Sequence, residues 1–322
     1  MYSRLALRFH LSTCGSSSEG GRMMRRILRF FRYLRISKSF SYGVITLVIL
    51  LILGYVVAPF APYDPMRWGK VPRDRPPSLK YPLGTTTVGQ DVFWLATYAI
   101  RNSFTLSILT GFFSMLIASF MGFISGYLNE KVTGKLTNLI IDSFSVIPGL
   151  PYIMVLAFSF KEYLNIPLIA LFLSTIGWAW PSKQLRSIIL EIREKTHVYT
   201  ARASGFSLFT IFWSEFLPYV LPWIATTVLN LMTWAIGMET ALGVFGLSSM
   251  EKATIGTTIY WAMNYQALLR GKWWWIGTPI VTVILMITSL YYISIGLGEM
   301  LNPRSRLAQL RRERIQWLKS EM

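Results

Sequence analysis

The chain has 322 residues, of which 53% are hydrophobic and only 15% charged, and its mean hydropathy is +0.44. Soluble globular domains carry about 25% charged residues, so this composition excludes an ordinary soluble fold. The formal net charge of +17 does not indicate nucleic-acid binding, because the basic residues lie between long apolar runs. A single cysteine, Cys14, excludes an intrachain disulfide framework, and the sequence contains no phosphate-binding loop, zinc motif or paired-carboxylate motif. We therefore predict neither a catalytic site nor a metal site.

Long apolar runs recur along the whole chain. A helix crosses the hydrocarbon core with about 20 mostly apolar residues. Six runs meet this requirement, at 39–63, 102–129, 138–160, 163–182, 216–238 and 273–298. The apolar stretch 253–269 is short and contains Thr, Asn and Gln, so we interpret it as a surface or re-entrant segment. The sequence thus predicts an all-α, polytopic transmembrane helix bundle of about six spans.

Lys and Arg residues are distributed unevenly between the segments that join these runs. With the N-terminus in the cytoplasm, the inner segments carry 22 of the 32 basic residues, including a cluster between residues 25 and 38. Cytoplasmic loops are enriched in Lys and Arg, so we expect both termini to be cytoplasmic. The predicted organisation is a basic cytoplasmic tail (1–38), a first span with an external loop (39–101), a core (102–298) and a second basic cytoplasmic tail (299–322).

The cytoplasmic segment 191–222 lies between the fourth and fifth runs. Its first part has helical periodicity, with Val198, Ala201, Arg202 and Gly205 on one face. Small residues on that face let another surface approach closely. Gly205 then interrupts the pattern, and a second apolar helix leads to Pro218. Helix, glycine turn and helix at the inner surface indicate a docking element, and an amphipathic connector is the alternative.

This segment resembles the EAA loop of binding-protein-dependent ABC importer permeases. Tyr199-Thr200-Ala201 occupies the place of the Glu-Ala-Ala triplet, so its glutamate and first alanine are replaced. The family spacing is kept through the positions Arg202, Ala203, Gly205, Leu217 and Pro218. The resemblance implies that these residues, together with Val198, contact an ATPase subunit.

Three further segments are similar to the C-type permeases of the peptide, nickel and opine importer group. The first includes Pro82-Leu83-Gly84-Thr85, Gly89, Asp91-Val92 and Arg101. The second includes Asp142, Phe144 and Pro148, and the third Leu301, Pro303 and Arg304. The resemblance covers roughly residues 40 to 306 in the family order. It implies a type I ABC importer permease fold.

The resemblance also implies a set of partners. These are a homologous second permease, two ATPase subunits that bind ATP and Mg, an extracellular solute-binding protein and membrane lipid, in a prokaryotic cell membrane. No cofactor is expected in this chain. Oligopeptides or dipeptides are the expected solutes, and an oligosaccharide importer of the same family is an alternative. An ion-coupled secondary transporter is the alternative from a different class, although few ionisable residues lie within the apolar runs.

Polar residues of the fifth run are candidates for the translocation path. They are Thr226, Thr227, Asn230 and Thr233. Polar groups within spans usually face a bundle interior or cavity, and interhelical hydrogen bonding is the alternative role. Asp142 is expected to lie at the interface or to pair with a base. Pro148, Pro151 and Pro181 are expected to bend spans three and four, and Trp273, Trp274 and Trp275 to form an interfacial aromatic belt.

Overall fold

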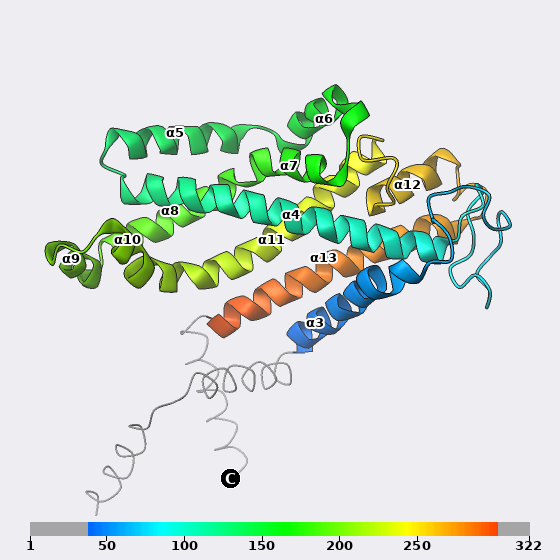
Figure 1. Cartoon of the computed structure of the whole chain (residues 1–322), viewed down its shortest axis with the longest axis horizontal. Coiled ribbons are helices and arrows are strands. Elements are labelled where there is room, and N and C mark those ends of the chain that lie inside the picture. Colours follow the sequence, from blue (N-terminus) through cyan, green and yellow to red (C-terminus); the bar gives the residue numbers. More distant parts are fainter. Residues whose placement is uncertain (1–37, 302–322) are drawn as a thin grey trace, which may run out of the picture.

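Helix α4 (Val92–Tyr127) is the longest element and lies at the centre of an all-helical bundle, shown in Figure 1 as a computed structural model. The structure describes residues 38–301, apart from the side chains of Lys38, His197, Arg202, Leu208 and Phe209. Both predicted basic tails lie almost entirely outside these residues. The N-cap residue Asp91 accepts a hydrogen bond from the backbone N–H of Phe93 at 2.9 Å and so fixes the start of α4.

Helix α4 is covered by helices on several sides. In Figure 1, α5 (Val132–Val146), α6 (Gly149–Ser159) and α7 (Ile166–Gly177) lie above α4. Below it lie α13 (Trp273–Leu301) and α3 (Lys38–Leu51), which continues as a π-helical turn, Ile52–Val57, and a 3-10 turn, Ala58–Phe60. Helices α8 (Ala179–Arg193) and α11 (Leu217–Val244) cross α4 and pack against it. Gly122 and Gly126 lie where α4 meets α8. A Cβ atom there would come within 2.9 Å of Leu185 or 2.8 Å of Ile189, so small residues permit this close packing.

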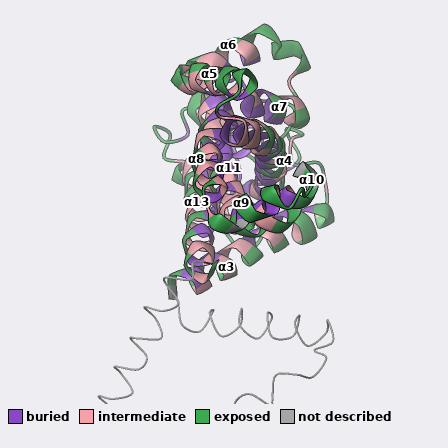
Figure 2. Ribbon diagram, turned by 90° about the vertical axis from the view of Figure 1, so that its left-hand side faces the viewer, coloured by how far each residue is buried: buried purple, intermediate pink, exposed green. Residues whose placement is uncertain are grey.

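Figure 2 shows exposed residues along the outside of the bundle, and many large apolar side chains of the long helices are among the exposed ones. On α4, Ile108, Phe112, Leu116 and Phe120 follow one another at four-residue spacing and are between 47% and 64% exposed. A soluble protein rarely exposes so large a contiguous apolar surface. This face is therefore suited to contact with lipid.

Within residues 38–301, four helices are long and apolar enough to cross a membrane: Ser39–Phe60, Val92–Tyr127, Phe212–Val244 and Trp273–Leu301. A fifth span results if α5 and α6, which meet at 84°, count as one. Helix α7 is apolar but has only 12 residues. Length and composition thus identify four or five of the about six predicted spans, because the predicted spans three and four are interrupted. The interruptions lie at Ile147–Pro148 and at Trp178, which confirms that Pro148 marks a bend.

The two ends of the bundle carry different short elements (Figure 1). At one end are α9 (Thr196–Ala203) and α10 (Leu208–Ile211), followed by a π-helical turn, Phe212–Phe216. At the other end are the loop 61–91 and α12 (Ile255–Asn264). Helix α12 is too short to span a bilayer, and its buried side chains pack among α4, α11 and α13. The segment 253–269, predicted to be a surface or re-entrant segment, is thus internal in its first half, and its re-entrant alternative stays a prediction.

Candidate functional site

The segment 191–222 forms two short helices separated by a turn, as its periodicity predicts. Helix α9 ends at Ala203, and the backbone N–H of Phe206 donates to the carbonyl of Ala201 across the turn at 3.3 Å. Gly205 has a φ of +76°, and no atom lies within 4 Å of the position that its Cβ would occupy. A glycine in the left-handed conformation is the usual end of a helix in this bonding pattern. The turn therefore requires Gly205 for its backbone conformation and not for internal space.

One face of α9 packs inside the chain. Val198 and Ala201 are buried in a cluster with Leu185, Ile189 and Phe216 from α8 and the π-helical turn. The prediction that these two side chains form the face approached by another protein is therefore wrong. They hold α9 on the bundle, because their burial against α8 is favourable.

The opposite side of α9 and the turn after it face outward (Figure 2). Tyr199 is 72% exposed and Phe206 56%, and Thr200, Ala203 and Gly205 are also exposed. Arg202 lies within α9, and its side chain is outside the description. Further along, Leu217 is partly buried and Pro218 is exposed at the start of α11. The predicted coupling residues therefore divide into buried anchors and an exposed surface.

Polar contacts fix this end of the bundle. Arg193 at the end of α8 forms an ion pair with Glu130 and donates to the carbonyl of Tyr127 at 3.2 Å. Arg186 donates to the side-chain oxygen of Asn129 at 2.7 Å. These contacts join α8 to the loop between α4 and α5. The exposed surface of α9 is therefore linked through α8 to α4 in the interior of the bundle.

A cavity of about 410 Å³ lies where the two helix interruptions meet the middle of α11. It is partly open and has no charged residue in its wall. Its lining comprises Phe144, Ser145, Ile147, Gly149, Ile176, Gly177, Ala179, Trp180, Pro181, Gln184, Thr227, Asn230, Leu231 and Trp234. Non-helical backbone at membrane depth is tolerated where it is buried in protein or lines a cavity. The interruptions thus shape this cavity.

The four path candidates have different surroundings. Thr227 and Asn230 line the cavity, whereas Thr226 and Thr233 are not among its lining residues. The hydroxyl of Thr233 donates to the carbonyl of Leu229 one turn back at 2.9 Å. Asn230 accepts a hydrogen bond from Ser294 of α13 at 2.9 Å, so it also joins two helices. Sequence reasoning missed Trp180, Gln184 and Trp234, although the prolines at 148 and 181 indicated where the helices break.

A buried carboxyl group near the end of α11 was also missed. Glu239 is fully buried and accepts hydrogen bonds from Thr254 at 2.5 Å, Ser248 at 3.0 Å and Ser103 at 3.4 Å. Ser103 belongs to α4, and Thr254 caps α12. The sequence predicts the fifth span at 216–238, yet α11 continues to Val244 and contains Glu239. Ionisable residues in spans are rare and pair with polar groups, which is the signal that identifies Glu239.

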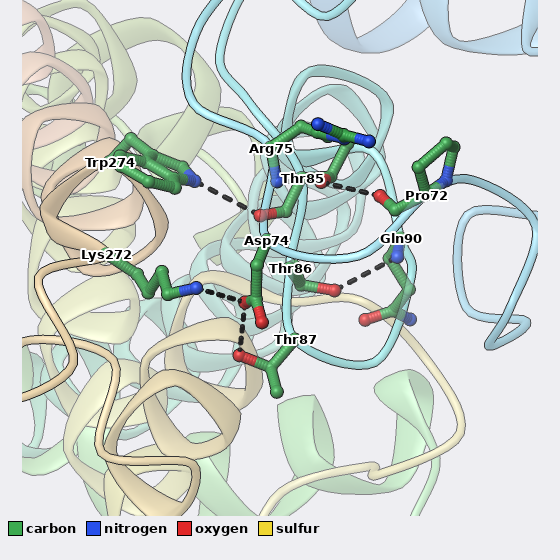
Figure 3. Close-up of polar contacts among 9 residues, drawn as sticks. All are labelled: Pro72, Asp74, Arg75, Thr85, Thr86, Thr87, Gln90, Lys272 and Trp274. Carbon is green, nitrogen blue, oxygen red and sulfur yellow. Dashed lines mark hydrogen bonds and ion pairs between the residues drawn. The ribbon is translucent and has the colours of Figure 1, made fainter.

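The loop 61–91 is folded tightly against the start of α13, as Figure 3 shows. Lys272 forms an ion pair with Asp74 at 2.9 Å, and Trp274 donates to the carbonyl of Thr85 at 3.1 Å. Within the loop, Thr85 donates to the carbonyl of Pro72 at 2.8 Å. Gly84 has a φ of +74°, and a Cβ there would lie 2.7 Å from Trp274. The Pro-Leu-Gly-Thr motif is therefore explained by a turn that only glycine fits.

Three ionisable groups of this loop have shifted pKa values. Burial opposes ionisation of Asp74, but hydrogen bonds from Lys272 and Thr87 and the charges of Lys272 and Arg270 outweigh it and lower its pKa. Burial raises the pKa of Asp91, although the backbone N–H of Phe93 opposes this. Burial and the adjacent Asp91 raise the pKa of Tyr63 to about 12. The loop thus has one stabilised carboxylate facing α13 and one buried carboxyl at the start of α4.

Two predictions about individual residues have clear outcomes. Asp142 forms an ion pair with Lys183 at 2.9 Å, which confirms the expected pairing with a base. The expected aromatic belt is wrong for two of its three tryptophans, because Trp274 and Trp275 are buried and only Trp273 is exposed. Trp275 stacks on Tyr265 with ring centroids 5.8 Å apart. Trp274 is covered by the loop 61–91, and Trp275 packs against the segment around Tyr265. These long-range contacts, which local sequence does not reveal, account for the burial.

Long apolar helices with exposed apolar faces are typical of a polytopic membrane protein. The family model described as "Binding-protein-dependent transport system inner membrane component" matches residues 114–307, more than half of the chain. The chain belongs to this family. It is a permease subunit of a binding-protein-dependent ABC transporter and a multi-pass component of the inner membrane. Such permeases are not the catalysts of their transporters, which in general also include ATPase and binding-protein partners.

Curated relatives cover most of the chain. The dipeptide transport system permease protein DppC of Bacillus subtilis is 24% identical over 86% of this chain and 85% of its own length. The oligopeptide transport system permease protein OppC of Mycobacterium bovis is 26% identical over 88% of this chain and 96% of its own length. A putative peptide permease protein of Brucella suis is 24% identical over 89% of this chain and 93% of its own.

A solved structure has the same fold. An inward-facing form of the MetNI methionine ABC transporter superposes on 65% of this chain and 97% of its own, with a TM-score of 0.53 and 15% sequence identity. At this level of identity the likeness shows the fold alone. It confirms the expected ABC importer permease architecture.

Proposed function

We propose that this chain is one of two homologous permeases in a peptide importer and forms half of the translocation path. The named relatives, 24% and 26% identical, are dipeptide and oligopeptide permeases, and this supports peptides as the solutes. Two ATPase subunits, which bind ATP and Mg, and an extracellular solute-binding protein complete the complex.

The observation that carries the mechanism is the exposed surface of α9 and the Gly205 turn at the end of the bundle opposite the loop 61–91 (Figure 1). We assign this surface to the cytoplasm, where it docks on an ATPase subunit, and both termini to the same side. Closure of the ATPase pair then shifts the permease between conformations, because the docked helices bind each state with different free energy. Val198 and Ala201 transmit the movement to α8 through their buried contacts.

Substituted-cysteine labelling tests this orientation. In a Cys14→Ser background, which removes the single native cysteine, Tyr199→Cys should react with an impermeant thiol reagent only in inside-out vesicles. Leu79→Cys, in the opposite loop and fully exposed, should react only in right-side-out vesicles. Val198→Cys, which is buried, is the matched unreactive control.

Assembly with the ATPase subunits should protect Tyr199→Cys but not Leu79→Cys. Labelling of Tyr199→Cys from the outside would overturn the orientation, and equal labelling with and without the ATPase subunits would overturn the docking role. Uptake of labelled peptides and oligosaccharides by the reconstituted complex tests the solute. Transport of oligosaccharides alone would favour the alternative importer of the same family.

A further inference from the structure

The cavity between the two helix interruptions and α11 offers hydrogen-bond donors without charge. Two carboxamides lie in its wall, and each has its oxygen already engaged. Asn230 accepts from Ser294 at 2.9 Å, and Gln184 accepts from the indole N–H of Trp223 at 3.2 Å. Within the described residues, the NH₂ groups of both side chains have no hydrogen-bonded partner. Four N–H donors therefore remain available to a ligand.

Aromatic surfaces form the rest of the recognition elements. Trp180 is 67% exposed, and Trp234 lies against the backbone of Gly177, where a Cβ would be 2.9 Å from its ring. Phe144 is held by Trp178, with ring centroids 5.2 Å apart. Gly177 thus makes room for the ring of Trp234, and Trp178 positions the ring of Phe144 at the cavity. Pockets that bind small molecules usually combine aromatic walls with a few such polar groups and have volumes of about 300–1,000 Å³.

The lining contains no Asp, Glu, Lys or Arg. Asn230, Gln184 and Trp180 are exposed on one side of the cavity, so a charged side chain that enters it loses part of its hydration and finds no countercharge to offset that loss. An uncharged side chain would lie against indole and phenyl faces, and backbone carbonyl oxygens would accept from the carboxamides.

We propose that this cavity is a substrate subsite in the permease that binds an uncharged stretch of extended peptide and discriminates against charged side chains. The inference rests on the proposed function, because it takes a peptide as the solute. Asn230 and Gln184 bind the peptide carbonyls, and Trp180 and Trp234 contact the uncharged side chain. Discrimination between peptides by this cavity then adds to the discrimination by the binding protein.

A change of selectivity tests the subsite. Uptake of Ala-Phe-Ala, Ala-Lys-Ala and Ala-Asp-Ala is measured in proteoliposomes of the whole complex, each at a concentration that saturates the binding protein. Saturation removes differences in the binding protein's affinity from the comparison. In Asn230→Asp, the uptake ratio of the lysine peptide to the aspartate peptide should rise about tenfold or more over wild type, because a countercharge now lies in the wall.

Two further variants keep the test decisive. Asn230→Leu removes the donor without adding charge and should lower uptake of Ala-Phe-Ala several-fold, even if Asn230→Asp fails to assemble. Thr240→Val, on the same helix but outside the cavity, is the matched control and should retain wild-type selectivity, because the hydroxyl of Thr240 donates only to the carbonyl of Ile236 within α11. Unchanged peptide ratios in Asn230→Asp, or equal effects of Asn230→Leu and Thr240→Val, would overturn the subsite. Absence of peptide uptake by the wild-type complex would instead overturn the proposed peptide solute, and the peptide occupant with it.

Discussion

Replacement of Glu239 by alanine should destabilise the connection between α4, α11 and α12. Ser103 and Ser248 would lose the carboxyl group to which they donate, whereas Thr254 keeps Thr257 as a partner at 3.2 Å. A buried donor left without an acceptor costs about 1–3 kcal/mol, and hydrogen bonds between membrane helices are commonly worth less than in soluble proteins. Two such donors give an expected loss of about 2–4 kcal/mol.

The variant Glu239→Gln distinguishes the stability that comes from hydrogen bonding from any stability that requires the carboxyl group itself. In Glu239→Gln, the amide oxygen can accept from Thr254 and Ser248, and the NH₂ group can donate to Ser103. The hydroxyl oxygen of Ser103 already accepts from the N–H of Ile255 at 3.1 Å and has a second lone pair available. The NH₂ group cannot accept, so the O–H of Ser103 loses its acceptor in this variant. We therefore expect a loss of about 1–2 kcal/mol, smaller than that of Glu239→Ala.

The assay is thermal unfolding of the purified complex in detergent. Glu239→Ala should lower the unfolding midpoint by roughly 5–10 °C, and the midpoint of Glu239→Gln should lie between those of Glu239→Ala and wild type. Glu251→Ala is the matched control, because Glu251 is an exposed residue of the adjacent connection. A Glu239→Ala midpoint equal to that of the control would refute the reasoning. Equal losses for alanine and glutamine would show that the acid, and not its hydrogen bonds, is required.

Three other perturbations follow from the contacts above. Gly205→Glu should abolish coupled uptake but leave membrane insertion intact. Gly271→Glu is the control, because Gly271 is also at positive φ with open space around it, so a side chain there causes the same backbone strain of about 1–2 kcal/mol at the opposite end of the bundle, and uptake should be retained. Equal loss of uptake in both variants would argue against a docking role. Asp74→Asn should make the loop 61–91 more sensitive to protease than Asp64→Asn, whose ion pair with Arg67 at 3.9 Å is exposed. The pKa of Asp74 is lowered in the folded chain, so its contribution to the stability of the loop is fully present above the unfolded pKa of about 3.9 and is lost as the pH falls through the lower folded pKa. The resistance of the wild-type loop to protease should therefore also fall over that acidic range. Resistance that does not change with acid would contradict this. The purified chain alone should hydrolyse no ATP, and turnover that follows this subunit through purification would contradict the assignment of nucleotide binding to partners.

The sequence by itself determined those features that depend on local physics. Apolar runs of bilayer length specify membrane helices, because backbone polar groups must be paired within lipid. The glycine at position 205 specified a left-handed turn, and proline at 148 specified a helix interruption, since each reflects the conformational limits of one residue. The order of the motifs was enough to identify the family.

Tertiary structure decided which side of each element faces the interior. Periodicity placed Val198 and Ala201 on one face, but only the position of α8 shows that this face is buried. Trp274 fits an interfacial belt by sequence, yet it is buried where the loop 61–91 folds over α13. The hydrogen-bond partners of Glu239 and the walls of the cavity come from segments far apart in the chain. Long-range packing sets these arrangements, and no local pattern encodes which helices will meet.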